Sequence, residues 1–98
     1  MEQKQPADLR DLCNAILCLR SPQECKAFLE DLCTIRELQD LSQRFAVAEM
    51  LDQGRNYAEI ASGTGASSAT ISRVNRCLQY GSRGYRLILD RKREEENK

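Results

Sequence analysis

Residues 57–78, with the sequence YAEIASGTGASSATISRVNRCL, decide how this chain is expected to fold. A short helix should begin near Tyr57 and carry Ile60. Gly65 follows where the chain must turn sharply, because glycine adopts positive φ at little cost. A second helix should follow the turn, since apolar residues recur there at helical spacing, at Ile71, Val74 and Leu78. The segment therefore predicts a helix-turn-helix.

The second helix of this motif has a face of small and basic side chains. Either Ser67 or Ser68 can cap the helix. Between the apolar positions lie Ser68, Ala69, Ser72, Arg73 and Arg76. Such side chains suit a helix that enters the major groove of duplex DNA. The alternative is an ordinary helical hairpin in which Gly65 is only a C-cap. The small Ala61, four residues before Gly65, favours the DNA-binding motif.

Roles can be assigned to the residues of this face. Ser68, Ala69 and Ser72 are expected to face base edges, where Ala69 can contact a thymine methyl group and the serines can donate or accept hydrogen bonds. Arg73 and Arg76 are candidates for contacts with phosphate or guanine. Because long side chains are few here, we expect DNA shape and bridging water to share the specificity.

The charge of the chain is zero overall but unevenly distributed. Residues 1–53 contain six basic and ten acidic side chains, whereas residues 54–93 contain eight basic and two acidic ones. The basic part coincides with the helix-turn-helix, where it can attract phosphate. Arg83 and Arg86 are expected to neutralise backbone phosphates, and Ser67 with nearby backbone amides can hold another. Alternatively, these arginines only solvate two helices.

The composition predicts an all-α protein. The chain has 98 residues, no Trp, and few of the β-branched and aromatic residues that sheets favour. No apolar run approaches the roughly 20 residues of a membrane span, and the N-terminal residues lack the apolar core of a secretory signal. We therefore expect a cytoplasmic protein with no membrane partner.

Six helices are expected, and capping signals mark their boundaries. The first should span residues 7–19, and the second should start at a Ser21-Pro22-Gln23-Glu24 capping box. Thr34 and Glu37 repeat this pattern before a longer helix that Gly54 ends, and Asn56 caps the next. Glycines at 81 and 84 separate the last two helices. We expect residues 1–93 to form one domain and residues 94–98 a disordered charged tail.

Neither a metal site nor a catalytic site is expected. The five cysteines contain no Cys-x-x-Cys pair, and the chain has no histidine. Cys13, Cys25 and Cys33 follow apolar helical stripes and are interpreted as small core residues of a reduced compartment. No nucleophile–base pair or phosphate-binding glycine loop stands out, so an enzyme is not expected, and the residues themselves call for no cofactor.

Residues 34–78 resemble the tryptophan repressor superfamily, and the whole chain resembles its YerC/YecD-like branch. The sequence TIRE at 34–37 opens a long helix that contains Arg44, and a short helix then leads to Gly65. The sequence ATISR at 69–73 closely matches the Ala-Thr-Ile-Thr-Arg of the repressor's reading helix. The resemblance implies a six-helix, intertwined homodimer that binds operator DNA through the helix-turn-helix.

The resemblance also implies a pocket for an amino-acid corepressor. In the repressor two arginines help to hold L-tryptophan; Arg44 and Arg73 match them, and Thr34 matches a pocket-lining threonine. An arginine can bind a carboxylate in bidentate fashion. Val74 departs from the pattern, since the repressor has glycine there and a β-branched side chain projects toward the space of the indole. Tryptophan is therefore a poor fit. Alternatively, Arg73 contacts phosphate and Arg44 pairs with a neighbouring carboxylate, of Asp40 or Glu49.

The sequence thus predicts a transcriptional regulator, most simply a repressor, that binds double-stranded DNA as a dimer. Short amphipathic N-terminal helices leave apolar surface that a second copy can cover. Two reading helices about 34 Å apart would meet successive major grooves of a palindromic operator. The zero net charge leaves one alternative, a helical dimeric protein-interaction module that keeps the helix-turn-helix frame without binding DNA.

Overall fold

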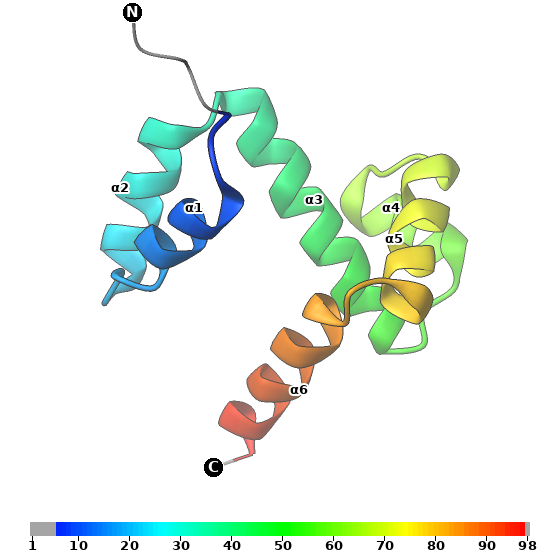
Figure 1. Ribbon diagram of the computed structural model, residues 1–98. Helices are drawn as coiled ribbons and strands as arrows, with labels where there is room; N and C mark the ends of the chain where they lie inside the picture. Colours follow the sequence, from blue (N-terminus) through cyan, green and yellow to red (C-terminus); the bar gives the residue numbers. More distant parts are fainter. Residues whose placement is uncertain (1–5, 98) are drawn as a thin grey trace, which may run out of the picture. The chain divides into compact units, whose positions relative to one another are not determined.

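The computed structural model describes residues 6–97, which form six α-helices and no strand (Figure 1). This confirms the predicted all-α fold. No helix in this range is long and apolar enough to cross a membrane. The helices are α1 (Leu9–Ile16), α2 (Pro22–Leu32), α3 (Ile35–Asp52), α4 (Tyr57–Thr64), α5 (Ser68–Tyr80) and α6 (Gly84–Glu96).

Two predicted capping boxes define the starts of α3 and α4. Thr34 Oγ1 accepts a hydrogen bond from the Glu37 N–H at 3.1 Å, and Glu37 Oε1 accepts from the Thr34 N–H at 2.8 Å. Asn56 Oδ1 and the Glu59 N–H form the same arrangement at 2.9 Å, with a return bond at 3.3 Å. Each box satisfies two N–H groups that a helix start otherwise leaves without partners.

The first two helices differ from the prediction in detail. The carboxylate of Asp8 accepts from the Arg10 N–H at 2.9 Å, so α1 begins at Leu9 and is shorter than the predicted 7–19 helix. Ser21 caps α2 as expected, but the Glu24 carboxylate accepts from the Arg20 N–H at 2.8 Å. The return hydrogen bond of the expected capping box is therefore formed with the N–H of Arg20 instead of that of Ser21.

The chain divides into two compact units, residues 1–38 and residues 39–98. The boundary falls within α3. In the first unit, neither α1 nor α2 contains a buried residue.

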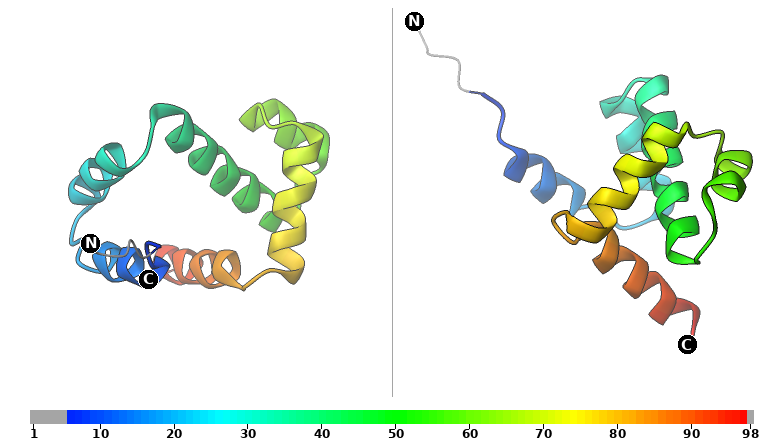
Figure 2. Two further views of the ribbon diagram at one scale, coloured as in Figure 1. Left: turned by 45° about the horizontal axis from the view of Figure 1, so that its top comes forward. Right: turned by 90° about the vertical axis from the view of Figure 1, so that its right-hand side faces the viewer.

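The second unit has a continuous apolar core that links all four of its helices. The buried residues are Val47, Ala48, Ile60, Ala66, Ile71, Val74 and Leu89. In the views of Figures 1 and 2, α4 and α5 lie beside the C-terminal half of α3, and α6 leaves the end of α5 in a new direction. This core fixes the helix-turn-helix against α3.

The last helix is longer than expected. It continues to Glu96, so residues 94–96 are helical, whereas the sequence suggested a disordered tail from residue 94. The backbone N–H of Asn97 bonds to the carbonyl oxygens of Arg93 and Glu94 and closes the final turn. These backbone bonds extend the helix into a segment whose composition alone favours disorder.

The first unit exposes several large apolar side chains. Leu9 is 71% exposed, Leu17 81% and Ile35 78%. Cys25 and Cys33 are half-buried, but Cys13 is exposed, which contradicts its assignment as a core residue within one chain. Apolar side chains at such exposure favour association, because burial of apolar area stabilises by about 25 cal/mol per Å².

Candidate nucleic-acid interface

The turn between α4 and α5 is held by short hydrogen bonds around Gly65. Gly65 adopts φ 73°, as predicted, and its N–H donates to the Ala61 carbonyl oxygen at 2.9 Å. The Thr64 hydroxyl donates to the Ile60 carbonyl oxygen at 2.7 Å and accepts from the Ala66 N–H at 3.1 Å. Since Ala66 is also part of the core, the turn is fixed on both sides.

Ser67 caps α5, which decides between the two serines considered from the sequence. Its Oγ accepts from the Thr70 N–H at 3.2 Å and donates to Thr70 Oγ1 at 3.1 Å. The hydroxyl proton of Ser67 is therefore used within the turn. In this arrangement the free backbone N–H groups of the first turn of α5 are better placed than the Ser67 hydroxyl to donate to a phosphate.

The predicted reading face of α5 points to solvent. Ile71 and Val74 are buried, and the small and basic side chains between them are exposed: Ser68, Ala69, Ser72, Arg73 and Arg76. Helix α5 contains no acidic residue. The face therefore combines exposure with positive charge, the two properties that binding to a phosphate backbone requires.

Arg83 lies in the connection between α5 and α6 in an unusual backbone conformation. Its φ is 68°, in the left-handed region that favours glycine, and it occupies the N-cap of α6 without a side-chain capping bond. Sequence reasoning missed this conformation, because the nearby glycines at 81 and 84 were the expected positions for a positive φ. Arg83 is exposed and remains compatible with its expected role at a phosphate.

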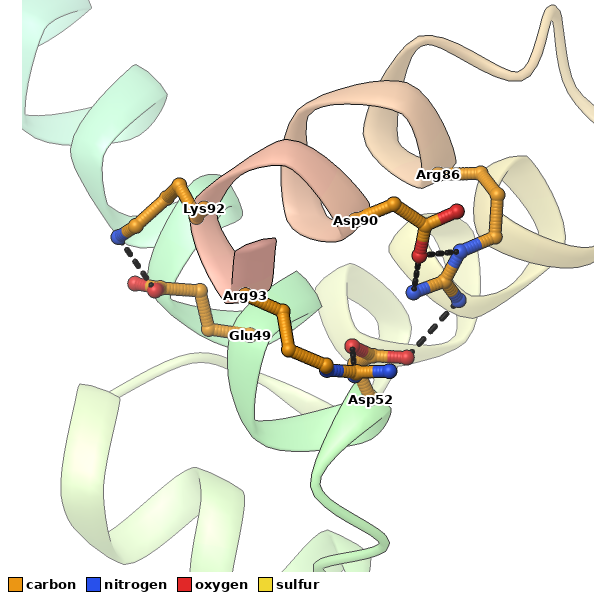
Figure 3. A network of polar contacts seen from close by, with 6 residues as sticks. All are labelled: Glu49, Asp52, Arg86, Asp90, Lys92 and Arg93. Atoms are coloured by element: carbon orange, nitrogen blue, oxygen red, sulfur yellow. Dashed lines mark hydrogen bonds and ion pairs between the residues drawn. The ribbon is translucent and has the colours of Figure 1, made fainter. Parts of the chain in front are cut away.

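Arg86, in contrast, is engaged by carboxylates (Figure 3). Its Nη1 lies 2.8 Å from Asp52 Oδ1, and its Nε lies 2.9 Å from Asp90 Oδ1. The hydrogen bond from Arg86 lowers the pKa of Asp52, and the two carboxylates raise the pKa of Arg86. A phosphate would have to compete with both carboxylates, so this geometry does not support the predicted contact of Arg86 with DNA.

Arg86 belongs to an ion-pair cluster between α3 and α6 that the sequence did not reveal. We call it the α3–α6 cluster; it consists of Glu49, Asp52, Arg86, Asp90, Lys92 and Arg93 (Figure 3). Lys92 Nζ lies 2.8 Å from Glu49 Oε2 and 5.3 Å from the centroid of the Phe45 ring. The cluster fixes α6 on α3 and uses part of the basic charge that the sequence assigned to DNA.

Arg44 and Arg73 line one cavity, as the corepressor interpretation requires. The cavity has a volume of about 200 Å³ and is also lined by Asp40, Gln43 and Thr70. Val74 is not among these residues, because its side chain is buried in the core. Thr34 serves the capping box of α3. Of the four predicted pocket residues, the structure thus brings together the two arginines.

The alternative partners for Arg44 are not used. Within residues 6–97 Arg44 forms no ion pair, and Glu49 is bound to Lys92. Arg44 is half-buried, Arg73 is exposed, and both line the cavity. Neither forms an ion pair within residues 6–97. The cavity therefore presents two positive groups to a solute, beside the carboxylate of Asp40.

Comparison with known proteins places this chain among relatives of the same fold. The profile of the Trp repressor protein family matches residues 7–93. The chain belongs to the Trp repressor family. It is 53% identical over 89 residues to the uncharacterized protein YerC of Bacillus subtilis (strain 168), an alignment that covers 91% of this chain and 86% of YerC.

Two crystal structures of Trp repressor-like proteins share the fold. A candidate Trp repressor from Staphylococcus aureus matches with a TM-score of 0.83 and 53% identity, over 87% of this chain and 85% of that one. A TrpR-like protein from Eubacterium eligens ATCC 27750 matches with a TM-score of 0.82 and 53% identity, over 85% and 86%. These findings confirm the resemblance to the superfamily and the predicted six-helix fold.

One polar contact of this Trp repressor family member was missed by sequence reasoning. Gln43 Nε2, on α3, donates to the Thr64 carbonyl oxygen at 3.1 Å, across 21 residues of chain. A single glutamine in a helix carries no local signal for such a bond. The cavity of Arg44 and Arg73 thus shares a wall residue with the helix-turn-helix turn.

Proposed function

We propose that this protein is a transcriptional regulator that binds double-stranded DNA through α5. The observation that carries the proposal is the exposed, acid-free face of α5, which follows a hydrogen-bonded turn on a Trp repressor fold. Ser68, Ala69 and Ser72 are assigned to base edges, and Arg73 and Arg76 to phosphate or guanine. Arg83 and the backbone amides at the start of α5 add phosphate contacts. Repression by occupying an operator is the simplest mode of action.

The regulator is proposed to act as a homodimer. Apolar side chains of α1 and of the start of α3 are exposed. In a two-fold symmetric dimer they can be buried against the same surface of a second copy. Two-fold symmetry also suits a helix-turn-helix protein, because two reading helices about 34 Å apart meet successive major grooves on one side of DNA.

The cavity beside α5 is proposed to accept a small carboxylate-bearing effector. Arg44 and Arg73 supply two unpaired guanidinium groups, which can bind a carboxylate, and Asp40 can bind an amino group. Val74 stands where the repressor has glycine, but its side chain is buried in the core and does not line this cavity, so the choice between tryptophan and other amino acids rests on the titration. Whether DNA binding requires this effector is tested by adding amino acids to the titration described next.

The test is a fluorescence-anisotropy titration of the full chain with duplex DNA, from about 50 to 200 mM salt. We expect affinity to fall steeply with salt, since each neutralised phosphate releases counterions. Arg76→Ala should reduce the slope of log K against log salt by about 1, through loss of one phosphate contact.

The matched control is Arg36→Ala, which removes an exposed arginine of the first unit and should leave the slope unchanged. A binding constant indifferent to salt would contradict the proposed phosphate contacts. A dimer without DNA affinity at low salt would instead favour the protein-interaction module.

A further inference from the structure

We propose that Gln43 is a positioning residue for DNA recognition, which sets the orientation of the first turn of α5 by holding the carbonyl group of Thr64. The inference rests on the proposed function of α5. Gln43 belongs to α3 and lies outside the helix-turn-helix, but it lines the same cavity as Arg73. The inference gives this residue a share in the sequence preference of the protein.

The carbonyl group that Gln43 binds is one that α4 cannot satisfy by itself. The last four carbonyl groups of an α-helix have no donor within the helix. At the end of α4 the Gly65 N–H reaches back to Ala61, and Gln43 Nε2 donates to Thr64 at 3.1 Å. A carbonyl oxygen only accepts, so the amide nitrogen of Gln43 must face it.

Among the hydrogen bonds of residues 6–97, this is the only one that joins α3 to residues 57–80. The buried residues that α3 shares with this segment in the core are apolar. Packing of side chains fixes the distance between helices, but small rotations of a polar turn then cost little free energy. A hydrogen bond is directional and therefore opposes such rotations. Gln43 thus controls a part of the turn that the core does not.

The controlled part leads directly into the reading face. Thr64 is separated from Ser67, the cap of α5, by Gly65 and Ala66. Gly65 is in the left-handed conformation, and Gln43 Nε2 lies 3.9 Å from the position that a Cβ atom would take there. Because the connection is so short, a shift of the Thr64 carbonyl group moves the cap of α5 and the exposed residues that follow it.

The bond to Thr64 depends on both the length of the Gln43 side chain and its amide donor. The residue is one turn before the fully buried Val47, which anchors this part of α3 in the core. Gln43→Leu keeps much of the volume and removes the donor. Gln43→Glu keeps length and polarity but offers only acceptors at neutral pH, which repel the Thr64 oxygen. The two variants remove the same bond in different ways.

The experiment measures amide hydrogen exchange and DNA specificity on the full chain. In Gln43→Leu the protection of the Gly65 and Ala66 amides should fall by about five-fold, since one hydrogen bond is worth about 1 kcal/mol. The ratio of non-specific to specific dissociation constants, measured with a duplex selected from a random pool, should fall by a similar factor of about five. The salt dependence should stay unchanged, because no phosphate contact is removed.

A merely structural role would give a different result. Partial unfolding lowers the active fraction for specific and non-specific DNA alike, so their ratio would not change. Gln39→Leu is the matched control, with the same substitution one turn earlier on α3 at an exposed residue. If Gln43→Leu fails to fold, Gln43→Glu carries the same expectation for the Gly65 and Ala66 amides; the salt dependence is not compared for this variant, because it adds a carboxylate to the cavity of Arg44 and Arg73.

The inference is overturned if turn protection or the specificity ratio of a folded Gln43 variant equals that of Gln39→Leu. If the parent protein shows no DNA affinity, the proposed function fails. The exchange rates of Gly65 and Ala66 then still decide whether Gln43 holds the turn.

Discussion

The two units of this chain differ in how far they bury their apolar side chains. Residues 39–98 bury seven apolar residues drawn from four helices and the turn between α4 and α5, whereas α1 and α2 bury none. The second unit therefore has the internal core that a rigid DNA-reading surface needs, and the first has amphipathic helices without a cover. The difference agrees with the proposed roles of the two units, DNA recognition by the second and association with another copy by the first.

The largest expected effect comes from the core of the second unit. Ile71→Ala should destabilise the protein by about 2–5 kcal/mol, because Ile71 is fully buried between the helices and its truncation leaves a cavity. Chemical denaturation followed by circular dichroism measures this. Ser72→Ala, at the next residue but exposed, should change stability by less than about 0.5 kcal/mol. Equal effects of the two variants would mean that α5 is not packed as described.

The first unit should respond in its association state instead of its fold. Leu9→Glu introduces a charge at a 71% exposed position of the apolar stripe of α1, so a single chain loses little. A dimer that buries this stripe must desolvate the charge, and we expect its dissociation constant to rise by about 100-fold, or about 2.7 kcal/mol.

Sedimentation equilibrium compares Leu9→Glu with Asn14→Glu, which places the same side chain at an exposed position off the stripe. Asn14→Glu should dimerise like the parent. If Leu9→Glu does so as well, α1 does not take part in the interface, and the contrast between the units needs another explanation.

The features that sequence reasoning predicted are local ones. The capping boxes at Thr34 and Asn56 are encoded three residues apart, and the turn at Gly65 is encoded by one residue with a special backbone freedom. The buried faces of α4 and α5 follow from helical periodicity. Each of these signals lies within one or two turns of helix, where a pattern in the chain maps directly onto geometry.

The features that were missed join residues distant in sequence. Asp52 and Arg86 are 34 residues apart, and Gln43 and Thr64 are 21 apart. Charged and amide side chains on helices usually face solvent, so their composition does not reveal which of them meet. The tertiary fold decides this, and it pairs Arg86 with Asp52 and Asp90 in the α3–α6 cluster. The positive φ of Arg83 is a local feature and was missed for another reason, since two glycines nearby were more obvious candidates.

The smallest expected effect concerns this cluster, which only the second unit possesses. The hydrogen bond from Arg86 lowers the pKa of Asp52, so the bond stabilises the fold above the unfolded carboxyl pKa of about 3.9. This stabilisation is lost as the pH falls through the lower, folded-state pKa. Asp52→Asn should therefore lower the melting temperature by a few degrees near neutral pH. The difference in melting temperature from the parent should shrink as the pH falls below the folded-state pKa of Asp52. Thermal melts at several pH values measure it, with Asp31→Asn, on the exposed surface of α2, as the control. A gap that persists at acid pH, or one that Asp31→Asn reproduces, would show that the ion pair of Asp52 does not distinguish the second unit from the first.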